Sequence, residues 1–214
     1  VFIAQALGAS KIVATEANQL ILDATSQIYQ VPNVTVIVET GRSFLRRTNR
    51  QFDVIVYSLT STYHPVSSGA YSLAEDYRMT VESLQDALSH LKPEGILIIT
   101  RWLQNPPSES LRIFGIAVTA LEALNLAPIP RLIAYRGYNT ATIAVKITPF
   151  TSQELDLLRG FTSRLAFDLV YTPDINPEET NVYNVLPESV YYQTFHDLIY
   201  TTDREQFHRQ YAFD

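Results

Sequence analysis

The chain has 214 residues, of which 46% are hydrophobic and 18% are charged, a composition typical of a globular protein with a sizeable core. Its formal net charge of −6 argues against nucleic acid or an anionic membrane as a partner, because both need clustered lysine and arginine. The absence of cysteine excludes disulfides, thiolate metal sites and cysteine nucleophiles. The four histidines show no metal-binding spacing, so no metal site is expected.

Apolar periodicity predicts helices and strands in alternation along the chain. The first half is expected to contain a helix over 1–8, a strand over 11–15, a helix over 18–29, strands over 34–39 and 52–58, a loop over 59–72, a helix over 74–91 and a strand over 95–102. The second half is expected to contain a helix over 108–125, a hairpin of strands over 131–136 and 140–147, a helix over 152–165 behind a capping signature, an apolar piece over 167–171, irregular structure over 172–188, and short helices near 188–200 and 202–211.

The predicted strands are continuously apolar, which indicates a sheet covered on both faces. Together with the alternation of elements, this predicts an α/β fold: a Rossmann-like, doubly wound, mostly parallel sheet with a C-terminal antiparallel hairpin. We expect one such domain over residues 1–150 and a helical extension packed on it over residues 151–214.

Polar residues follow three of the predicted strands. Glu16 follows the strand over 11–15, and Glu39 and Ser58 close the strands over 34–39 and 52–58. Ligands of open α/β sheets bind beyond the carboxyl ends of the strands, so these three ends form the candidate binding edge.

Glu16, followed by Ala17, has two interpretations. A carboxylate at such a strand end accepts two hydrogen bonds from a ribose diol. Alternatively, it is an ordinary carboxylate at a helix start, stabilised by the helix dipole. No neighbouring basic residue suits a phosphate, which favours an unphosphorylated ribose.

The segment from Glu39 through Thr40 and Gly41 to Arg42 also has two interpretations. The carboxylate of Glu39 could take the amino group of an adenine, with the backbone N–H groups that follow reading the edge of the ring. Alternatively, the segment is a turn that needs its glycine, with Arg42 on the surface.

The loop after the strand over 52–58 is rich in hydroxyl groups and could line a substrate cleft, or it could be an ordinary polar loop. The candidate substrate-binding residues are Thr60, Tyr63 and Tyr71. Asp76 and Tyr77 open the helix predicted after the loop and are the candidate catalytic residues. The alternative for Asp76 is a carboxylate that the helix dipole stabilises.

Four runs of sequence together resemble the class I S-adenosylmethionine methyltransferase superfamily, in its spermidine-synthase-like branch. They are residues 8–18 (GASKIVATEAN), 39–45 (ETGRSFL), 52–58 (FDVIVYS) and 91–97 (LKPEGIL). The resemblance covers residues 1–147 and is looser beyond them. It implies S-adenosylmethionine or its decarboxylated form as cofactor, with Glu16 on the ribose and Glu39–Arg42 at the adenine.

Two departures from the family pattern bear on function. The family's opening strand and Gly-x-Gly loop should precede Val1, and no Gly-x-Gly occurs in the chain. We therefore expect a fragment with a non-standard or intermolecularly completed sheet, because the opening strand would lie between the strands over 11–15 and 52–58. Spermidine synthases also carry aspartates where this chain has Ser58 and Ser61, which argues against the usual aminopropyl transfer.

The first functional hypothesis is a methyl or aminopropyl transferase-like domain, weak or inactive in isolation, that acts on a small molecule such as a polyamine. The second is a non-catalytic Rossmann-like scaffold, the soluble domain of a larger membrane protein. A third is an NAD-type domain, which the second acidic strand end fits less well. The resemblance further implies a cytoplasmic location, as a domain tethered to the spans of an inner-membrane protein, and a homodimer is among the expected assemblies.

Overall fold

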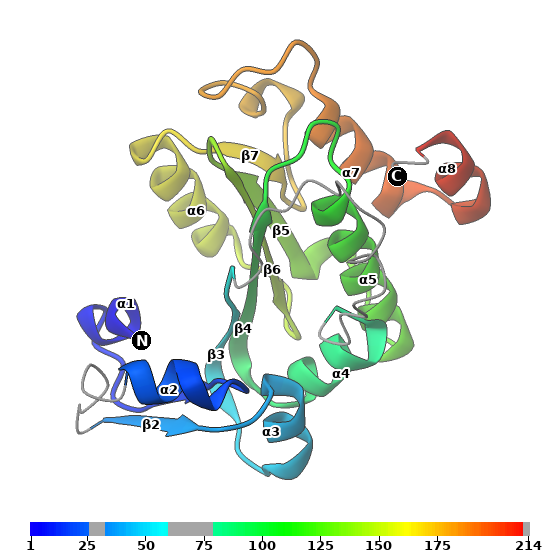
Figure 1. Cartoon of the computed structure of the whole chain (residues 1–214). Helices are drawn as coiled ribbons and strands as arrows, with labels where there is room; N and C mark the ends of the chain where they lie inside the picture. The colour runs from blue at the N-terminus through cyan, green and yellow to red at the C-terminus, as the bar shows by residue number, and fades with distance from the viewer. Residues whose placement is uncertain (26–32, 60–78, 212–214) are drawn as a thin grey trace. The chain divides into compact units, whose positions relative to one another are not determined.

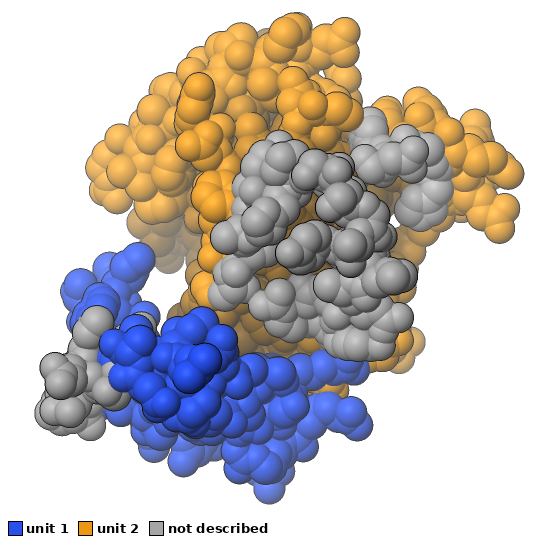
Figure 2. Space-filling view, in the orientation of Figure 1, with its two compact units in different colours: residues 1–50 blue, residues 51–214 orange. Residues whose placement is uncertain are grey.

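The computed structural model describes residues 1–25, 33–59 and 79–211. The chain forms two compact units, Val1–Arg50 and Gln51–Asp214, which are coloured separately in Figure 2. The boundary between these units falls elsewhere than after residue 150. The expected division into domains at that point stays a prediction.

The first unit is built on a short parallel sheet. Strand β1 (Ile12–Thr15) pairs with β2 (Val34–Ile37). Helix α2 (Gln19–Thr25) connects towards β2, and α1 (Phe2–Ala6) precedes β1. Gly8, at a φ of 83°, lies just past the end of α1, where a left-handed residue commonly terminates a helix. These four elements confirm the predicted order. α1, β1 and β2 are shorter than predicted, whereas residues 26–29 of the helix predicted over 18–29 lie outside the described residues.

Helix α3 (Gly41–Arg47) was not predicted. Thr40 begins it as N-cap residue, and its Oγ1 accepts a hydrogen bond from the backbone N–H of Ser43. The helix buries Phe44 and Leu45, whose adjacent positions give too short an apolar pattern for a helix to be recognised. Gly41, which one of the two interpretations placed in a turn, is therefore the first residue of a helix.

The second unit holds a five-stranded sheet in the order β3-β4-β6-β5-β7. Its strands are β3 (Phe52–Tyr57), β4 (Leu91–Trp102), β5 (Leu132–Arg136), β6 (Thr140–Lys146) and β7 (Asp168–Tyr171). β3 and β4 are parallel, whereas β6 is antiparallel to both β4 and β5. The predicted hairpin is thus confirmed, and its second strand lies inside the sheet. The apolar piece after residue 167 is the strand β7, antiparallel to β5.

Helices cover both faces of this sheet, as expected of a doubly wound fold. Figure 1 shows α6 (Ser152–Arg164) on one side, and α4 (Val81–Ser89), α5 (Glu109–Ala123) and α7 (Val190–Tyr200) on the other. Under α6, Leu155 packs with Ile133 and Ala144 of the sheet. On the opposite side, α5 buries Ile113 and Phe114, which have no exposed surface. Helix α8 (Arg204–Gln210) follows α7.

Two predicted boundaries need correction. β4 begins at Leu91 rather than residue 95, because Leu91 already pairs with Phe52 before an irregularity between Phe52 and Val54. This irregularity accommodates Pro93, which cannot donate to a regular ladder. Helix α4 begins at Val81, whereas residues 74–78 of the predicted helix lie outside the described residues.

Side chains satisfy backbone N–H groups at the starts of α5 and α6. The predicted capping box of α6 is present, with the Thr151 side chain on the Glu154 backbone and the Glu154 side chain on the Thr151 backbone. Ser108 is the N-cap residue of α5 but makes no capping hydrogen bond. Gln104 replaces it, since its Oε1 accepts from the Glu109 backbone N–H at 2.9 Å.

In the part of the chain that the structure describes, none of the helices combines the length and apolarity required to cross a bilayer.

Candidate functional site

Glu16 and Glu39 meet at the carboxyl edge of the β1–β2 sheet. The register pairs Thr15 with Ile37 at the ends of the two parallel strands. Beyond this pair, the backbone N–H groups of Glu16 and Glu39 both donate to the carbonyl oxygen of Ile37, each at 3.1 Å. The two predicted acidic strand ends are therefore next to each other in space, on one edge of one sheet.

The Glu16 carboxylate stabilises the turn that leads into α2. Its Oε1 accepts a hydrogen bond from the Asn18 backbone N–H at 2.8 Å. Asn18 in turn accepts from the Leu20 backbone N–H through Oδ1, at 3.0 Å, so Asn18 rather than Glu16 caps the helix. A carboxylate has about four lone-pair sites, and one hydrogen bond leaves room for a diol. Ala17 lies exposed in the same turn.

Glu39 forms an ion pair with Arg47 at the other end of α3. Only 18% of the Glu39 side chain is exposed, against 64% of that of Arg47. The hydrogen bond to Glu39 and its negative charge raise the pKa of Arg47 above its usual value. Any ligand amino group that approaches Glu39 therefore shares the carboxylate with this guanidinium or displaces it.

The start of α3 packs against the end of β1. A Cβ atom added to Gly41 would lie 3.4 Å from Oγ1 of Thr15, an ordinary contact, and the φ of Gly41 is not in the left-handed region. Glycine is therefore not required here by backbone conformation, contrary to the turn interpretation. Thr40 is occupied with capping, since its Oγ1 also donates to Oγ of Ser43 at 2.8 Å. Arg42 follows Gly41 in the first turn of α3 and is partly exposed.

The remaining candidate residues belong to the second unit. Ser58 is exposed directly after β3. The substrate-binding candidates and the two catalytic candidates lie outside the described residues: Thr60, Tyr63, Tyr71, Asp76 and Tyr77. The structure thus brings together the two expected acidic strand ends of the first unit and, among the candidates of the second unit, describes only the cofactor-binding candidate Ser58.

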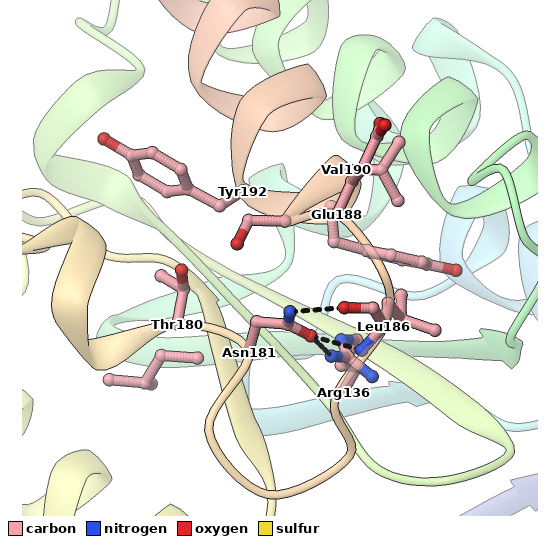
Figure 3. A pocket seen from close by; sticks show the side chains of 10 residues that line it. Arg136, Thr180, Asn181, Leu186, Glu188, Val190 and Tyr192 are labelled. Atoms are coloured by element: carbon pink, nitrogen blue, oxygen red, sulfur yellow. Dashed lines mark hydrogen bonds between the residues drawn. The ribbon is translucent and has the colours of Figure 1, made fainter.

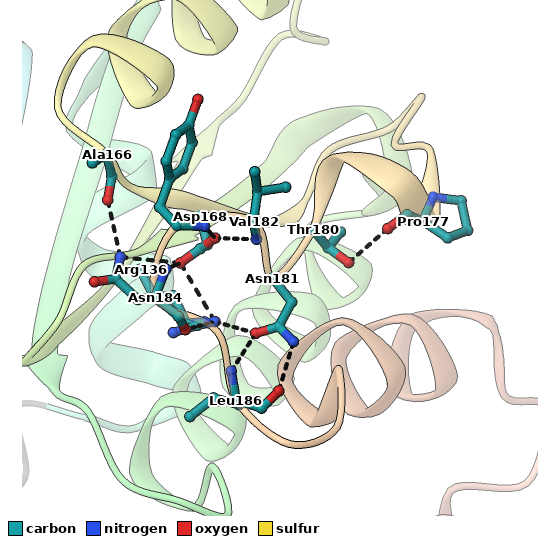
Figure 4. A network of polar contacts seen from close by, with 10 residues as sticks. Arg136, Ala166, Asp168, Pro177, Thr180, Asn181, Val182, Asn184 and Leu186 are labelled. Carbon is teal, nitrogen blue, oxygen red and sulfur yellow. Dashed lines mark hydrogen bonds and ion pairs between the residues drawn. The ribbon is translucent and has the colours of Figure 1, made fainter.

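A polar network in the second unit was not predicted from the sequence. Figure 4 shows Arg136 of β5 and Asp168 of β7 among the residues of the loop over 181–186. Asp168 Oδ1 accepts from the backbone N–H groups of Val182 and Tyr183, at 2.6 and 2.8 Å. The sequence did contain a signal: Arg136 and Asp168 are charged residues near the ends of the apolar runs over 131–136 and 167–171. The strand prediction gave no reason for these charges.

The small pocket in Figure 3 adjoins the same network. It is lined by Arg136, Leu169, Thr180, Asn181, Leu186, Glu188, Ser189, Val190, Tyr191 and Tyr192. Its cavity volume is about 10 Å³, which is room for about one water molecule. Asn181 Oδ1 accepts from Arg136 Nη2 and from the Leu186 backbone N–H, both at 2.8 Å. The pocket is therefore part of the structural support of the loop and too small for an organic ligand.

Among the residues that the structure describes, no group of three or more histidine and acidic side chains is placed to hold a metal ion.

No protein-family model matches the chain, and no curated protein matches it significantly. Solved structures do resemble it. The probable spermidine synthase of Corynebacterium glutamicum has a TM-score of 0.53 at 15% identity, over 74% of this chain and 56% of that one. Human methyltransferase-like protein 13, solved with SAH, has a TM-score of 0.49 at 18% identity, over 76% of this chain and 74% of that one. Spermidine synthase from Thermotoga maritima has a TM-score of 0.46 at 18% identity, over 83% of this chain and 57% of that one.

The chain therefore shares the fold of the probable spermidine synthase of Corynebacterium glutamicum, in agreement with the Rossmann-like fold that the sequence predicted. The chain spans a little over half the length of the Corynebacterium glutamicum protein.

Proposed function

We propose that the edge formed by Glu16 and Glu39 binds the adenosine part of S-adenosylmethionine or of its decarboxylated form, in a methyl or aminopropyl transferase. The observation that carries this proposal is the convergence of the two glutamates on the Ile37 carbonyl. Two carboxylates at the ends of neighbouring parallel strands suit a nucleoside, whose ribose diol and exocyclic amino group are both donors. Unlike a phosphate, neither group requires a cation.

In this proposal Glu16 accepts hydrogen bonds from the ribose hydroxyls, and Glu39 accepts one from the adenine amino group. Ala17 and the segment Thr40–Arg42 flank the ring, and Ser58 is a further proposed contact of the cofactor. Thr60, Tyr63 and Tyr71 border the acceptor, and Asp76 and Tyr77 orient it. The lone pair of the acceptor attacks the carbon on the cationic sulfur. The carbon–sulfur bond would break with its electron pair left on the sulfur, which becomes neutral, and the acceptor would release its proton to solvent. Such a step depends mainly on alignment.

Calorimetric titration of the protein with S-adenosylmethionine and with its decarboxylated form tests this assignment. Glu16→Gln should weaken binding by about tenfold to a hundredfold, because hydrogen bonds to a charged acceptor are worth about 1.5–3 kcal/mol. Glu205→Gln is the matched control, since it makes the same change in the first turn of α8. Equal affinities of wild type and Glu16→Gln would contradict the ribose assignment. The tighter ligand distinguishes methyl from aminopropyl transfer.

A second candidate function is a non-catalytic scaffold. Two observations favour it: Arg47 already occupies Glu39, and β3 is followed by Ser58 instead of a carboxylate. A folded protein that binds neither nucleoside would support the scaffold, whereas turnover with either nucleoside would exclude it.

The acceptor and the cellular setting belong to the same proposal. A small-molecule acceptor, with polyamines among the candidates, a cytoplasmic location, tethering to membrane spans and a homodimer all come from the family resemblance. Turnover assays with polyamine acceptors and sedimentation analysis of the protein test the acceptor and the assembly.

A further inference from the structure

A groove of about 430 Å³ lies among helices α4, α5, α7 and α8 of the second unit. Its described lining comprises Val81, Ser108, Leu111, Arg112, Gly115, Ile116, Thr119, Leu198, Arg204, Phe207 and Tyr211. Figure 1 shows α4, α5 and α7 on the same side of the five-stranded sheet, with α8 following α7. None of these residues belongs to the edge proposed for the nucleoside, so the groove is a separate feature.

One face of α5 forms the length of the groove. Its lining residues recur every three to four positions, as single residues or adjacent pairs, which is the spacing of one helix face: Ser108, Leu111 and Arg112, Gly115 and Ile116, and Thr119. At a rise of about 1.5 Å per residue, this stripe is about 16 Å long. The groove is therefore elongated along α5.

Apolar side chains dominate the middle of the groove. Leu198 of α7 and Phe207 of α8 face the stripe on α5 and are each only 5% exposed. Gly115 lets α7 approach closely, because a Cβ at this position would lie 3.3 Å from Cδ1 of Leu198. A ligand in this part of the groove would gain from apolar contact.

The two arginines that line the groove differ in whether they have a carboxylate partner. At the α8 end, Arg204 Nη2 pairs with Glu122 at 2.5 Å, and the Tyr211 hydroxyl donates to Asp197 Oδ2 at 2.7 Å. Arg112, one turn into α5, is exposed and has no carboxylate within ion-pair distance among the described residues. An anion is thus attracted to the Arg112 end, because the Arg204 guanidinium at the other end already has Glu122 as its partner.

The volume of the groove suits a small molecule. At about 430 Å³ it lies within the range of about 300–1,000 Å³ that small-molecule sites occupy.

We propose that this groove binds an amphiphilic carboxylate with a medium-length alkyl chain. Its carboxylate pairs with Arg112, and its tail extends over Gly115 and Ile116 towards Phe207. A polyamine does not fit, since the two charged side chains of the lining are arginines.

The test is a titration with octanoate, decanoate and laurate below their micellar concentrations, followed by ¹⁵N NMR and calorimetry. Affinity should rise about fourfold for each added methylene that is buried, and the shifts should map to α5 and α8. Dodecyltrimethylammonium, which has the tail of laurate and the opposite charge, should bind more weakly. Arg112→Gln should weaken laurate binding about threefold to tenfold, whereas Arg164→Gln, the same change on the exposed end of α6, should not.

Three results would overturn the proposal: no binding of laurate by folded protein, equal binding of the cationic and anionic amphiphiles, or an Arg112→Gln variant that binds laurate as tightly as wild type. Ile116→Ala gives a second check that does not alter charge, since it should lower the affinity for laurate severalfold through lost tail contact. All titrations are done without nucleoside, so their outcome is independent of the proposed transferase function.

Discussion

Arg136 and Asp168 form an ion pair that is almost entirely buried, with Arg136 Nη2 3.4 Å from Asp168 Oδ2 and 2% and 0% of the two side chains exposed. The pair joins the neighbouring strands β5 and β7, where Arg136 is directly paired with Asp168. Arg136 also donates to the Asn184 carbonyl at 2.7 Å and lies over the Tyr191 ring, 5.6 Å from its centroid. The pair therefore connects the sheet edge, the loop over 181–186 and helix α7.

Removing the negative charge of this pair should destabilise the protein strongly. Asp168→Ala leaves Arg136 buried without its counter-ion and the backbone N–H groups of Val182 and Tyr183 without their acceptor. Breaking a buried pair in this way costs about 3–5 kcal/mol. Urea unfolding followed by circular dichroism measures the loss, with Asp156→Ala on the exposed surface of α6 as control, expected within about 0.5 kcal/mol of wild type. Similar losses for both variants would contradict this role.

The same carboxylate should make stability depend on acid pH. Burial alone raises the pKa of Asp168, but hydrogen bonds from Tyr183 and Asn184 and the charge of Arg136 outweigh it, so the net pKa is lowered. A carboxyl group with a lowered pKa in the folded state contributes stability above its unfolded pKa of about 3.9, and this contribution is lost as the pH falls through the folded value. The difference in unfolding free energy between wild type and Asp168→Asn should therefore be constant between pH 5 and pH 7 and shrink below about pH 4. A difference that stays constant down to pH 2 would contradict the assignment.

Local signals in the sequence predicted most elements of the second unit. The capping box of α6 depends on Thr151 and Glu154, three residues apart, and it is present as expected. The start of β4 was missed because it depends on Phe52, which is 39 positions away from Leu91 and pairs with it only in the folded sheet. Local patterns cannot show such a partner, so residues 91–94 were not predicted as part of the strand.

The candidate site was likewise predicted only in part. The strand-end rule predicted Glu16 and Glu39, and the structure places both at the Ile37 carbonyl. The pairing of Glu39 with Arg47 follows from the unpredicted helix α3, which carries Arg47 back to the strand end.

Two glycines of the second unit should respond in opposite ways to substitution by alanine. A Cβ at Gly95 would lie 2.7 Å from the carbonyl oxygen of Phe52 and 3.0 Å from that of Lys92. Both contacts are with backbone, so the strand must shift, and Gly95→Ala should cost about 1–3 kcal/mol as an overpacked site. Gly160 lies within α6 with nothing within 4 Å of its added Cβ. Gly160→Ala should stabilise the protein by about 0.5–1 kcal/mol through helix propensity. Thermal and urea unfolding of the two variants checks both signs, and destabilisation by Gly160→Ala would show that the glycine serves a purpose other than flexibility.

The ion pair between Glu39 and Arg47 allows the adenine assignment to be tested by a variant that should bind S-adenosylmethionine more tightly, instead of by one that should bind it more weakly. If Glu39 accepts the adenine amino group, then Arg47 competes for the same carboxylate, and Arg47→Gln should bind S-adenosylmethionine more tightly than wild type does. Arg46→Gln is the matched control, since it makes the same change in the same last turn of α3 at a residue with no described contact to Glu39. Calorimetric affinities of the three proteins give the answer. Weaker binding by Arg47→Gln would instead mean that Arg47 orients the carboxylate for the ligand, and unchanged binding would remove Glu39 from the nucleoside site.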